Sequence, residues 1–418
     1  MTDGGAPLAD AAWLRDPLLS RLLAALDCDG EEARVVGGAV RNALLGEPVR
    51  EVDVATTALP EEVVRRVAGA GFRAVPTGIE HGTVTAVADG HAFEVTTLRR
   101  DVETFGRHAK VAFGRDWKAD AERRDFTINA LSASRDGQVF DYTTGRADLA
   151  MRRVRFIGDP HRRIAEDYLR ILRFFRFHAA YAEGAPDALG LSACIAGRAG
   201  LDQLSRERIR MELLKLAVAR HAVPAFAVMA DAGLLIRVLG GVPDLAGFSR
   251  MTAIEAATGA APDAIRRLGA LGVRIAEDAN RLGERLRLAN AEHDRLVSMA
   301  QDWWRVRPRD EKAARALLYT LGPERFKDRV LLAWSRAQSD PTDMAWRDLA
   351  ALPQRWTAPV FPLKAADFLS RGIEKGPALG AALRAAEEAW IAADFPDSAE
   401  AIGPIADAAA GRRLQSRT

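Results

Sequence analysis

Residues 35–53 read Val-Val-Gly-Gly-Ala-Val-Arg-Asn-Ala-Leu-Leu-Gly-Glu-Pro-Val-Arg-Glu-Val-Asp, and this stretch decides the fold of the first part of the chain. A short β-branched run predicts a strand that ends at the glycine pair 37–38. An amphipathic turn with Arg41 follows, and a second strand then carries Glu51 and Asp53. Because residues two apart on a strand point to the same face, both carboxylates should lie on one side of a sheet.

This combination is typical of a site for a metal ion and a triphosphate. Gly37 and Gly38 have no Cβ, so their backbone N–H groups can approach phosphate oxygens. Arg41, near the start of a helix, would neutralise phosphate charge. Glu51 and Asp53 offer the oxygen ligands that Mg²⁺ prefers together with substrate phosphates. The alternative for Arg41 is a surface helix residue, and the alternative for Asp53 is a turn or cap residue. The neighbouring glycines and arginine favour the metal site.

Glu94 is a candidate third carboxylate for this site. In a two-metal site, one cation lowers the pKa of an attacking hydroxyl and the other stabilises the leaving pyrophosphate. Such sites often use a third carboxylate, and Glu94 lies in the middle of the strand-like run 91–97 between apolar neighbours. The alternative is an ordinary exposed strand residue, and the alternation of side chains favours neither.

Composition bounds the class of protein. The chain has 418 residues, of which 48% are hydrophobic, enough for two or more cores. Its net charge of +2 gives no global basic field. Cys28 and Cys194 lie far apart and have no metal-type spacing, which predicts a reducing compartment without a disulfide framework. The absence of a leader-type segment and of a long apolar run predicts a soluble cytoplasmic protein.

The pattern of the chain changes near residue 160. Before it, short strands and helices alternate, which predicts an α/β head; after it, apolar residues recur at helical spacing. The expected strands are 33–36, 51–55, 72–75, 82–88, 91–98 and 138–141, with helices at 11–26 and 60–69. The expected domains are a head at 1–150, a helical neck at 151–225, a helical body at 226–350 and a helical tail at 351–418.

A helix predicted at 163–182 carries the residues best suited to recognise a base. Asp167, Arg170 and Arg173 are spaced by three and would share one face. A carboxylate accepts hydrogen bonds from the amino groups of adenine and cytosine but is repelled by the oxygens of guanine and uracil. Arg170 would donate to acceptors on the same base edge. The alternative is an ion pair between Glu166 and Arg170 on a solvated face.

The pair Arg124 and Asp125, next to Phe126, has two readings from the residues alone. It offers both a donor and an acceptor, which suits a ribose 2′-hydroxyl. An ordinary salt bridge is the more common explanation of such a pair.

Several motifs in order give the chain a resemblance to class II template-independent RNA nucleotidyltransferases, the tRNA CCA-adding enzymes and bacterial poly(A) polymerases. The family pattern Gly-Gly-x-Val-Arg-Asp, then Asp-x-Asp, corresponds to Gly37–Asn42 and Glu51–Asp53, with Asn42 and Glu51 at places where the family usually has Asp. The later motifs are Arg123–Ala130, which resembles the ribose motif, Glu166–Arg173, which resembles the base-selecting helix, and Arg206–Glu212, which resembles the next neck motif.

The resemblance implies a polymerase β-like nucleotidyltransferase head followed by an all-α neck, body and tail. It implies addition of CCA to the 3′ end of tRNA from CTP and ATP, with Mg²⁺ held by Glu51 and Asp53. It also assigns ribose recognition to the motif with Arg124, Asp125 and Asn129, base selection to Asp167 and Arg170, and triphosphate contact to Arg173. In the family, the polar segment 101–120, which reads as a mobile loop, helps to switch from adding C to adding A. We expect a monomer or weak homodimer, and an active enzyme because the later motifs are complete.

Two other functions stay open from the sequence. A poly(A) polymerase, or a partial enzyme that adds only CC or only A, would share the chemistry. Bacterial poly(A) polymerases tend to carry a basic Gly-Arg-Arg-Phe-type element, whereas this chain has Gly114-Arg115-Asp116-Trp117, which favours CCA addition. A catalytically weak RNA-binding homologue is the second alternative, and Glu51 and Asn42 are the residues that support it.

Overall fold

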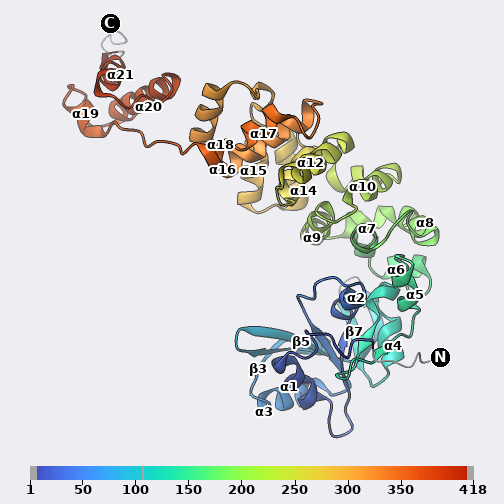
Figure 1. Cartoon of the computed structure of the whole chain (residues 1–418). Helices are drawn as coiled ribbons and strands as arrows, with labels where there is room; N and C mark the ends of the chain where they lie inside the picture. The colour runs from blue at the N-terminus through green and yellow to red at the C-terminus, as the bar shows by residue number, and fades with distance from the viewer. Residues whose placement is uncertain (1–6, 106–107, 412–418) are drawn as a thin grey trace. The chain divides into compact units, whose positions relative to one another are not determined.

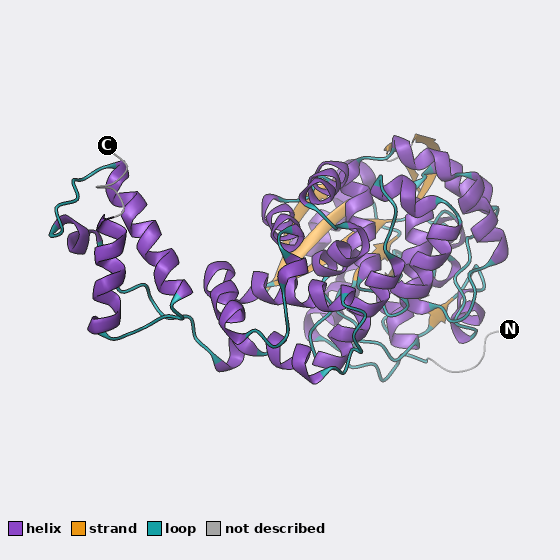
Figure 2. Ribbon diagram, turned by 90° about the horizontal axis from the view of Figure 1, so that it is seen from above, coloured by secondary structure: helices purple, strands orange, loops and turns teal. Residues whose placement is uncertain are grey.

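A computed structural model describes residues 7–105 and 108–411. The chain divides into two compact units, Met1–Gly241 and Val242–Thr418. All strands of the described residues lie before residue 141, and the rest of the chain is helical (Figure 2). The expected α/β head with a helical remainder is therefore confirmed, whereas the boundaries of the four expected domains remain a prediction.

The first unit begins with the α/β head (Figure 1). Its main sheet has seven strands in the order β3-β4-β5-β2-β1-β8-β9, in which only β2 and β5 are parallel neighbours. The elements are α1 (Pro17–Leu26), β1 (Ala33–Val36), α2 (Gly38–Leu44), β2 (Asp53–Thr56), α3 (Pro60–Gly69), β3 (Arg73–Gly78), β4 (Thr83–Ala88), β5 (His91–Thr97), β6 (Arg99–Phe105), β7 (His108–Phe113), α4 (Trp117–Glu122), β8 (Ser132–Ala133), β9 (Val139–Phe140) and α5 (Gly145–Ala150).

Helices α1 and α3 contact each other and pack on the sheet (Figure 1). Leu22, Val63 and Val67 of these helices are fully buried, as are Val54 of β2 and Val95 of β5. Burying apolar surface stabilises a fold by about 25 cal/mol per Å². This burial fixes the register of the central strands, because a slip by one residue would expose their core face to water. The start of β2 and the middle of β5 are therefore held rigidly beside each other.

Three expectations about local structure need correction. The helix expected at 11–26 begins only at Pro17, whose cap Asp16 accepts a hydrogen bond from the Leu19 N–H. The strand expected at 51–55 begins at Asp53, so Glu51 precedes it. The segment 101–120, read as a loop, instead contains most of the hairpin β6–β7 and the first turn of α4.

Helices complete the first unit and form the second. The first unit continues with α6 (Pro160–Glu166), α7 (Leu169–Tyr181), α8 (Ala188–Ala196), α9 (Arg206–Ala217), α10 (Ala222–Asp231) and α11 (Leu234–Leu239). The second unit contains α12 (Leu245–Thr258), α13 (Ala264–Gly272), α14 (Ala276–Leu286), α15 (Asn290–Ala300), α16 (Glu311–Arg336), α17 (Met344–Ala350), α18 (Leu352–Arg355), α19 (Ala365–Leu369), α20 (Pro377–Ala392) and α21 (Ala399–Gly411).

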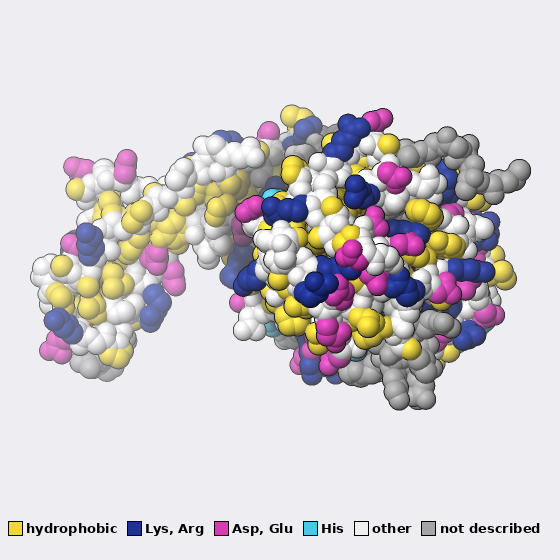
Figure 3. Space-filling view, turned by 90° about the horizontal axis from the view of Figure 1, so that it is seen from below, with side chains coloured by type: hydrophobic (Ala, Val, Ile, Leu, Met, Phe, Trp, Pro, Cys, Tyr) yellow, Lys and Arg dark blue, Asp and Glu magenta, His cyan; other side chains and the backbone are white. Residues whose placement is uncertain are grey.

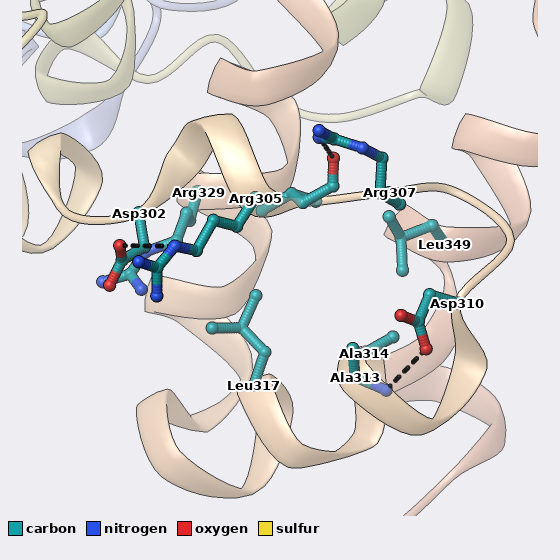
Figure 4. Close-up of a pocket in the computed structure, with 10 residues that line it drawn as sticks. Asp302, Arg305, Arg307, Asp310, Ala313, Ala314, Leu317, Arg329 and Leu349 are labelled. Carbon is teal, nitrogen blue, oxygen red and sulfur yellow. Dashed lines mark hydrogen bonds and ion pairs between the residues drawn. The ribbon is translucent and has the colours of Figure 1, made fainter.

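The second unit has a small pocket beside the start of α16 (Figure 4). Its volume is about 200 Å³, and Asp302 and Arg305 form an ion pair of 3.4 Å at its wall. Asp310 lines it as well, and its carboxylate accepts a hydrogen bond from the Ala313 N–H at the start of α16. None of the site residues expected from the sequence lines this pocket, so it is separate from the predicted site.

The surface agrees with a chain of nearly balanced charge. On the face drawn in Figure 3, Lys and Arg side chains alternate with Asp and Glu side chains instead of forming one basic field. No helix in residues 7–105 and 108–411 is long and apolar enough to cross a membrane. Cys28, which is exposed, and Cys194, which is buried, are both free thiols.

Candidate functional site

The glycine turn lies between β1 and α2, as the sequence predicts. Gly37 has φ of +66°, a conformation that residues with a Cβ rarely adopt. A Cβ at this position would lie 3.5 Å from both Nη1 of Arg124 and the carbonyl oxygen of Asn129. The turn therefore brings the backbone of the first motif against residues that come some ninety positions later in the chain.

Arg41 of α2 extends from this turn and is buried. Its Nη1 donates to Oδ1 of Asn129 at 2.5 Å, and its Nη2 donates to the hydroxyl of Tyr181 at 2.7 Å. Oδ1 of Asn42 accepts from its Nε at 3.1 Å and from its Nη2 at 2.9 Å. Since Tyr181 belongs to α7, this side chain links the head to the first long helix after it.

The carboxylates meet at the start of β2. Asp53 is paired in register with Glu94 of the parallel strand β5, so the two side chains are neighbours on one face. Burial raises the pKa of Asp53, and the charges of Glu94 and Glu51 raise it further, whereas Arg124 lowers it. Asp53 is exposed to solvent and lies in a cluster of like charges.

Arg124 and Asp125 do not pair with each other. Nη2 of Arg124 lies 3.1 Å from Oδ2 of Asp120, and Asp125 pairs with Arg173 of α7 at 2.5 Å. Burial alone would raise the pKa of Asp125, but Arg173, Nδ2 of Asn129 and the adjacent backbone N–H lower it overall. The common salt-bridge explanation of the Arg124–Asp125 pair is therefore wrong.

Phe126 anchors this pair of residues. Its ring is fully buried and lies 4.9 Å from the ring of Phe156 and 5.3 Å from that of Phe177, centroid to centroid. Phe177 belongs to α7, so the aromatic cluster fixes Asp125 next to that helix.

The single helix expected at 163–182 is wrong, because the chain breaks between α6 and α7. Asp167 has extended backbone angles, and its Oδ1 accepts a hydrogen bond from the Leu169 N–H at the start of α7. Its other oxygen pairs with Arg208 of α9 at 2.6 Å. Asp167 is therefore not on a helix face with Arg170 and Arg173, as the spacing by three suggested.

Arg170 and Arg173 do lie on α7. Nη1 of Arg170 lies 2.5 Å from Oε2 of Glu166, which is the ion pair that the sequence offered as an alternative to base recognition. Arg173 contacts Asp125 and also lies 3.7 Å from Glu212 of α9. Leu169, the first residue of the same helix, is buried.

One open cleft of about 730 Å³ collects these residues. Eleven of the twelve predicted site residues line it, and within the described chain eight arginines and five carboxylates do so. The predicted residues on the cleft are Gly37, Gly38, Arg41, Glu51, Asp53, Arg124, Asp125, Asn129, Asp167, Arg170 and Arg173. Glu94 does not line the cleft; it is connected to the cleft through Asp53, its partner in the strand pairing of β2 and β5.

Comparison with known proteins identifies the family. Residues 33–155 match the poly(A) polymerase head domain, and residues 192–247 match the probable RNA and SrmB-binding site of polymerase A. The chain is 35% identical to mitochondrial CCA tRNA nucleotidyltransferase 1 of Mus musculus, with 87% of this chain and 83% of the relative covered. It is 32% identical to the CCA-adding enzyme of Limosilactobacillus fermentum, with 93% and 96% covered. The chain belongs to the CCA-adding enzyme family.

A solved CCA-adding enzyme shares the fold along nearly the whole chain. The crystal structure of the Bacillus stearothermophilus CCA-adding enzyme in complex with CTP matches with a TM-score of 0.74 at 27% identity, over 98% of this chain and 99% of that one. A Thermotoga maritima CCA-adding enzyme complexed with tRNA matches with a TM-score of 0.65 at 17% identity, which shows the fold alone. The predicted nucleotidyltransferase head with its helical extension is thus confirmed.

Sequence reasoning did not assign three arginines that line the cleft of this CCA-adding enzyme family member. Arg99 is the first residue of β6, where no local pattern marks a site, whereas Arg123 follows α4 and opens the Arg123–Ala130 motif without a role assigned to it. Arg176 of α7 had a signal that was overlooked, since it follows Arg173 by three positions and therefore shares its helix face.

Proposed function

We propose that this protein adds C, C and A to the 3′ end of tRNA, using CTP and ATP and releasing pyrophosphate. The single cleft carries the proposal, because it brings the glycine turn, the carboxylates and the arginines of α7 together. The primer 3′-oxygen attacks the α-phosphorus, the bond between the α-phosphorus and the oxygen that bridges to the β-phosphate breaks, pyrophosphate leaves with that oxygen, and the proton of the hydroxyl passes to solvent. Relatives named CCA tRNA nucleotidyltransferase and CCA-adding enzyme support this reaction.

The carboxylate cluster fits a divalent cation, which we propose to be Mg²⁺. Asp53 and Glu51 offer only oxygen donors, and the mutual repulsion that raises the pKa of Asp53 would be relieved by a cation. Among the described residues, no group of three or more His, Cys, Asp or Glu is arranged to hold a metal by itself. The nucleotide phosphates and water would therefore complete the ligand set. When bound, the cation supplies Lewis-acid stabilisation of the phosphate oxygens.

The triphosphate and ribose would be held by groups of the head. Arg41 and Arg124 flank the glycine turn, so both guanidinium groups can bind phosphate oxygens beside its backbone N–H groups. Asp125 and Asn129 lie next to them and are hydrogen-bonded to each other at 3.2 Å. We assign them to the ribose 2′-hydroxyl, which both donates and accepts. Arg173, which holds Asp125, would then position this residue and contact the triphosphate.

Base selection falls to the junction of α6 and α7. Asp167 would accept from the amino group of cytosine or adenine, and its ion pair with Arg208 holds the carboxylate in place for that purpose. The contacts of Arg170 within the described chain engage only its Nη1, which leaves Nε and Nη2 as donors for a base edge. This division of roles predicts that CTP and ATP are accepted and that GTP and UTP are refused.

The partners follow from the same proposal. The segment 192–247, which matches an RNA-binding family model, and the helical tail would bind the tRNA beyond its 3′ end. We further propose a cytoplasmic protein that is a monomer or weak homodimer.

The test uses purified protein, Mg²⁺ and tRNA transcripts that end before CCA, after C and after CC. Each transcript is incubated with CTP, ATP, GTP, UTP or CTP with ATP, and the product lengths are read on a sequencing gel. Addition of CCA followed by a stop supports the proposal. A long A ladder would indicate a poly(A) polymerase, addition of only CC or only A would indicate a partial enzyme, and retained tRNA binding without extension would indicate an RNA-binding homologue.

Glu94 can be tested separately, since it contacts the site only through Asp53. We expect Glu94→Gln to raise the Mg²⁺ concentration for half-maximal activity by about tenfold, because neighbours of metal ligands tune metal affinity by 10- to 100-fold. The measurement is a Mg²⁺ titration of CTP incorporation. Glu61→Gln, on the exposed start of α3, makes the same chemical change as a control. Equal Mg²⁺ requirements for Glu94→Gln and the wild type would assign Glu94 to the exposed strand surface instead.

A further inference from the structure

Arg41 differs in its partners from three other arginines of the cleft. Arg173, Arg176 and Arg208 each form an ion pair with a carboxylate. Arg41 is hydrogen-bonded to the amide oxygens of Asn42 and Asn129 and to a tyrosine hydroxyl, and no carboxylate of the described residues comes within ion-pair distance of it.

This guanidinium is buried and still reaches the cleft. Only 6% of Arg41 is exposed, yet it lines the cleft next to Gly38, where a Cβ would lie 3.6 Å from its Nη2. Burial of a cation without a carboxylate is costly, because neutral acceptors repay only part of the lost hydration. Burial lowers the pKa of Arg41 by more than Tyr181 and the charge of Asp125, beyond ion-pair distance, raise it, but an arginine side chain stays protonated in proteins.

The aromatic residues of α7 fix the position of this cation. The guanidinium lies 3.9 Å from the centroid of the Tyr181 ring and 5.4 Å from that of Phe177. Such contacts stabilise a cation without cancelling its charge for a ligand on the other side. Tyr181 also accepts a hydrogen bond from Nη2, so the ring and the hydroxyl together orient the side chain.

Asn42 is placed where an acid would neutralise this charge. Its single Oδ1 accepts from both Nε and Nη2 of Arg41, the arrangement in which a carboxylate would form a bidentate ion pair. An amide at this position gives the same hydrogen bonds without the negative charge.

We propose that Asn42 and Tyr181 are positioning residues that hold Arg41 as an uncompensated cation whose counter-anion is the triphosphate of the incoming CTP or ATP. The inference rests on the proposed function, in which Arg41 contacts the nucleotide. Neither residue touches the reacting atoms; both act through the guanidinium. Because Tyr181 lies on α7 and Arg41 lies on α2 of the head, the affinity for the nucleotide depends on contact between the head and this helix.

The test is binding of CTP in Mg²⁺ buffer to the free protein at several KCl concentrations, together with steady-state addition to tRNA. Asn42→Asp should raise the Kd and the KM for CTP about tenfold and leave kcat within about twofold, because it neutralises a cation that contacts the triphosphate equally in the ground and transition states. Its Kd should also depend less on salt than that of the wild type, because one positive charge of the site is cancelled.

Tyr181→Phe keeps the ring and removes the hydroxyl acceptor. It should raise the Kd for CTP about threefold, the value of a modest hydrogen bond, with the wild-type salt dependence. Asn290→Asp, at the exposed start of α15, is the matched control for the added charge and should change neither quantity.

The outcomes separate this inference from the proposed function. A wild-type protein that neither binds CTP nor extends tRNA contradicts both. A wild type that binds and extends, with Asn42→Asp equal to it in Kd and in salt dependence, overturns the role of Asn42. A Tyr181→Phe variant with the wild-type Kd overturns the role of Tyr181.

Discussion

Replacing Asp53 with Asn should lower kcat/KM for nucleotide addition by at least about a thousandfold, because cation binding at this carboxylate accounts for several kcal/mol of transition-state stabilisation. The Kd for tRNA should change by less than about twofold, since one cleft carboxylate contributes little to a large RNA interface. The measurements are single-turnover CTP incorporation and filter binding of the same tRNA.

The fold should tolerate this substitution. The pKa of Asp53 is raised in the folded protein, so its ionised form is less stable there than in the unfolded chain. At neutral pH the ionised carboxylate therefore destabilises the head. The head becomes more stable only when the pH falls through the raised pKa and Asp53 is protonated. We expect the Tm of Asp53→Asn to equal or slightly exceed that of the wild type, which separates a lost activity from a lost fold.

Asp89→Asn is the matched control. Asp89 is exposed in the turn between β4 and β5, where its φ of +50° is tolerated well by Asn. This variant should extend tRNA like the wild type. If Asp53→Asn keeps more than about a tenth of the wild-type kcat/KM, Asp53 is not a metal ligand in the reaction, since loss of a ligand should cost far more.

The arrangement of the first motif follows from its local sequence. The glycine pair, Arg41 and Asp53 lie within one turn and one strand pairing, so their order in the chain nearly fixes their arrangement. Arg124 and Asn129 could be predicted to lie near the glycine turn only because they belong to the Arg123–Ala130 motif. Their contact with Gly37 depends on the return of the chain to the same sheet edge, which no spacing rule provides.

The break at Asp167 shows how a helical period misleads. Residues 163–182 are spaced like one helix, but Asp167 uses its carboxylate to bind the Leu169 N–H, which competes with continued helix. An Asp just before an apolar run is a typical helix start, so the signal was present in the sequence. Asp167 and Arg208 are 41 positions apart in the sequence, so local spacing could not predict their ion pair.

The hairpin β6–β7 was missed for a different reason. Its two strands pair only with each other and form a sheet of their own. In its first strand, Val102 and Phe105 are three positions apart, so that stretch lacks the period-two apolar alternation that marks a half-buried strand. Polar residues and the glycines at 106 and 114 then resemble a loop.

The second large effect concerns the stability of the second unit. Asp328 of α16 is 1% exposed and binds two arginines: Nε of Arg266 at 2.9 Å and Nε of Arg295 at 2.8 Å. Glu255 of α12, also 1% exposed, pairs with Arg266 at 2.8 Å and with Arg267 at 2.7 Å. These side chains form one buried ionic cluster that joins α12, α13, α15 and α16.

Asp328→Ala should lower the free energy of unfolding of the second unit by about 3–5 kcal/mol, because it leaves buried guanidinium charge without its partner. For a unit of this size the Tm should fall by about 10 °C. Asp328→Asn, which keeps an acceptor without the charge, should lie between the wild type and Asp328→Ala. Calorimetry of the full chain gives the values.

The control for this prediction is an exposed ion pair of the same unit. Arg371 and Asp407 lie 2.8 Å apart, but 70% of the Asp407 side chain is exposed, so Asp407→Ala should cost less than about 1 kcal/mol. The contrast isolates burial from pairing, since both substitutions remove one carboxylate from an arginine. Equal losses of Tm for Asp328→Ala and Asp407→Ala would mean that water reaches the Arg266 and Arg295 guanidinium groups once Asp328 is removed. The buried cluster would then contribute no more to the stability of the second unit than a surface salt bridge does.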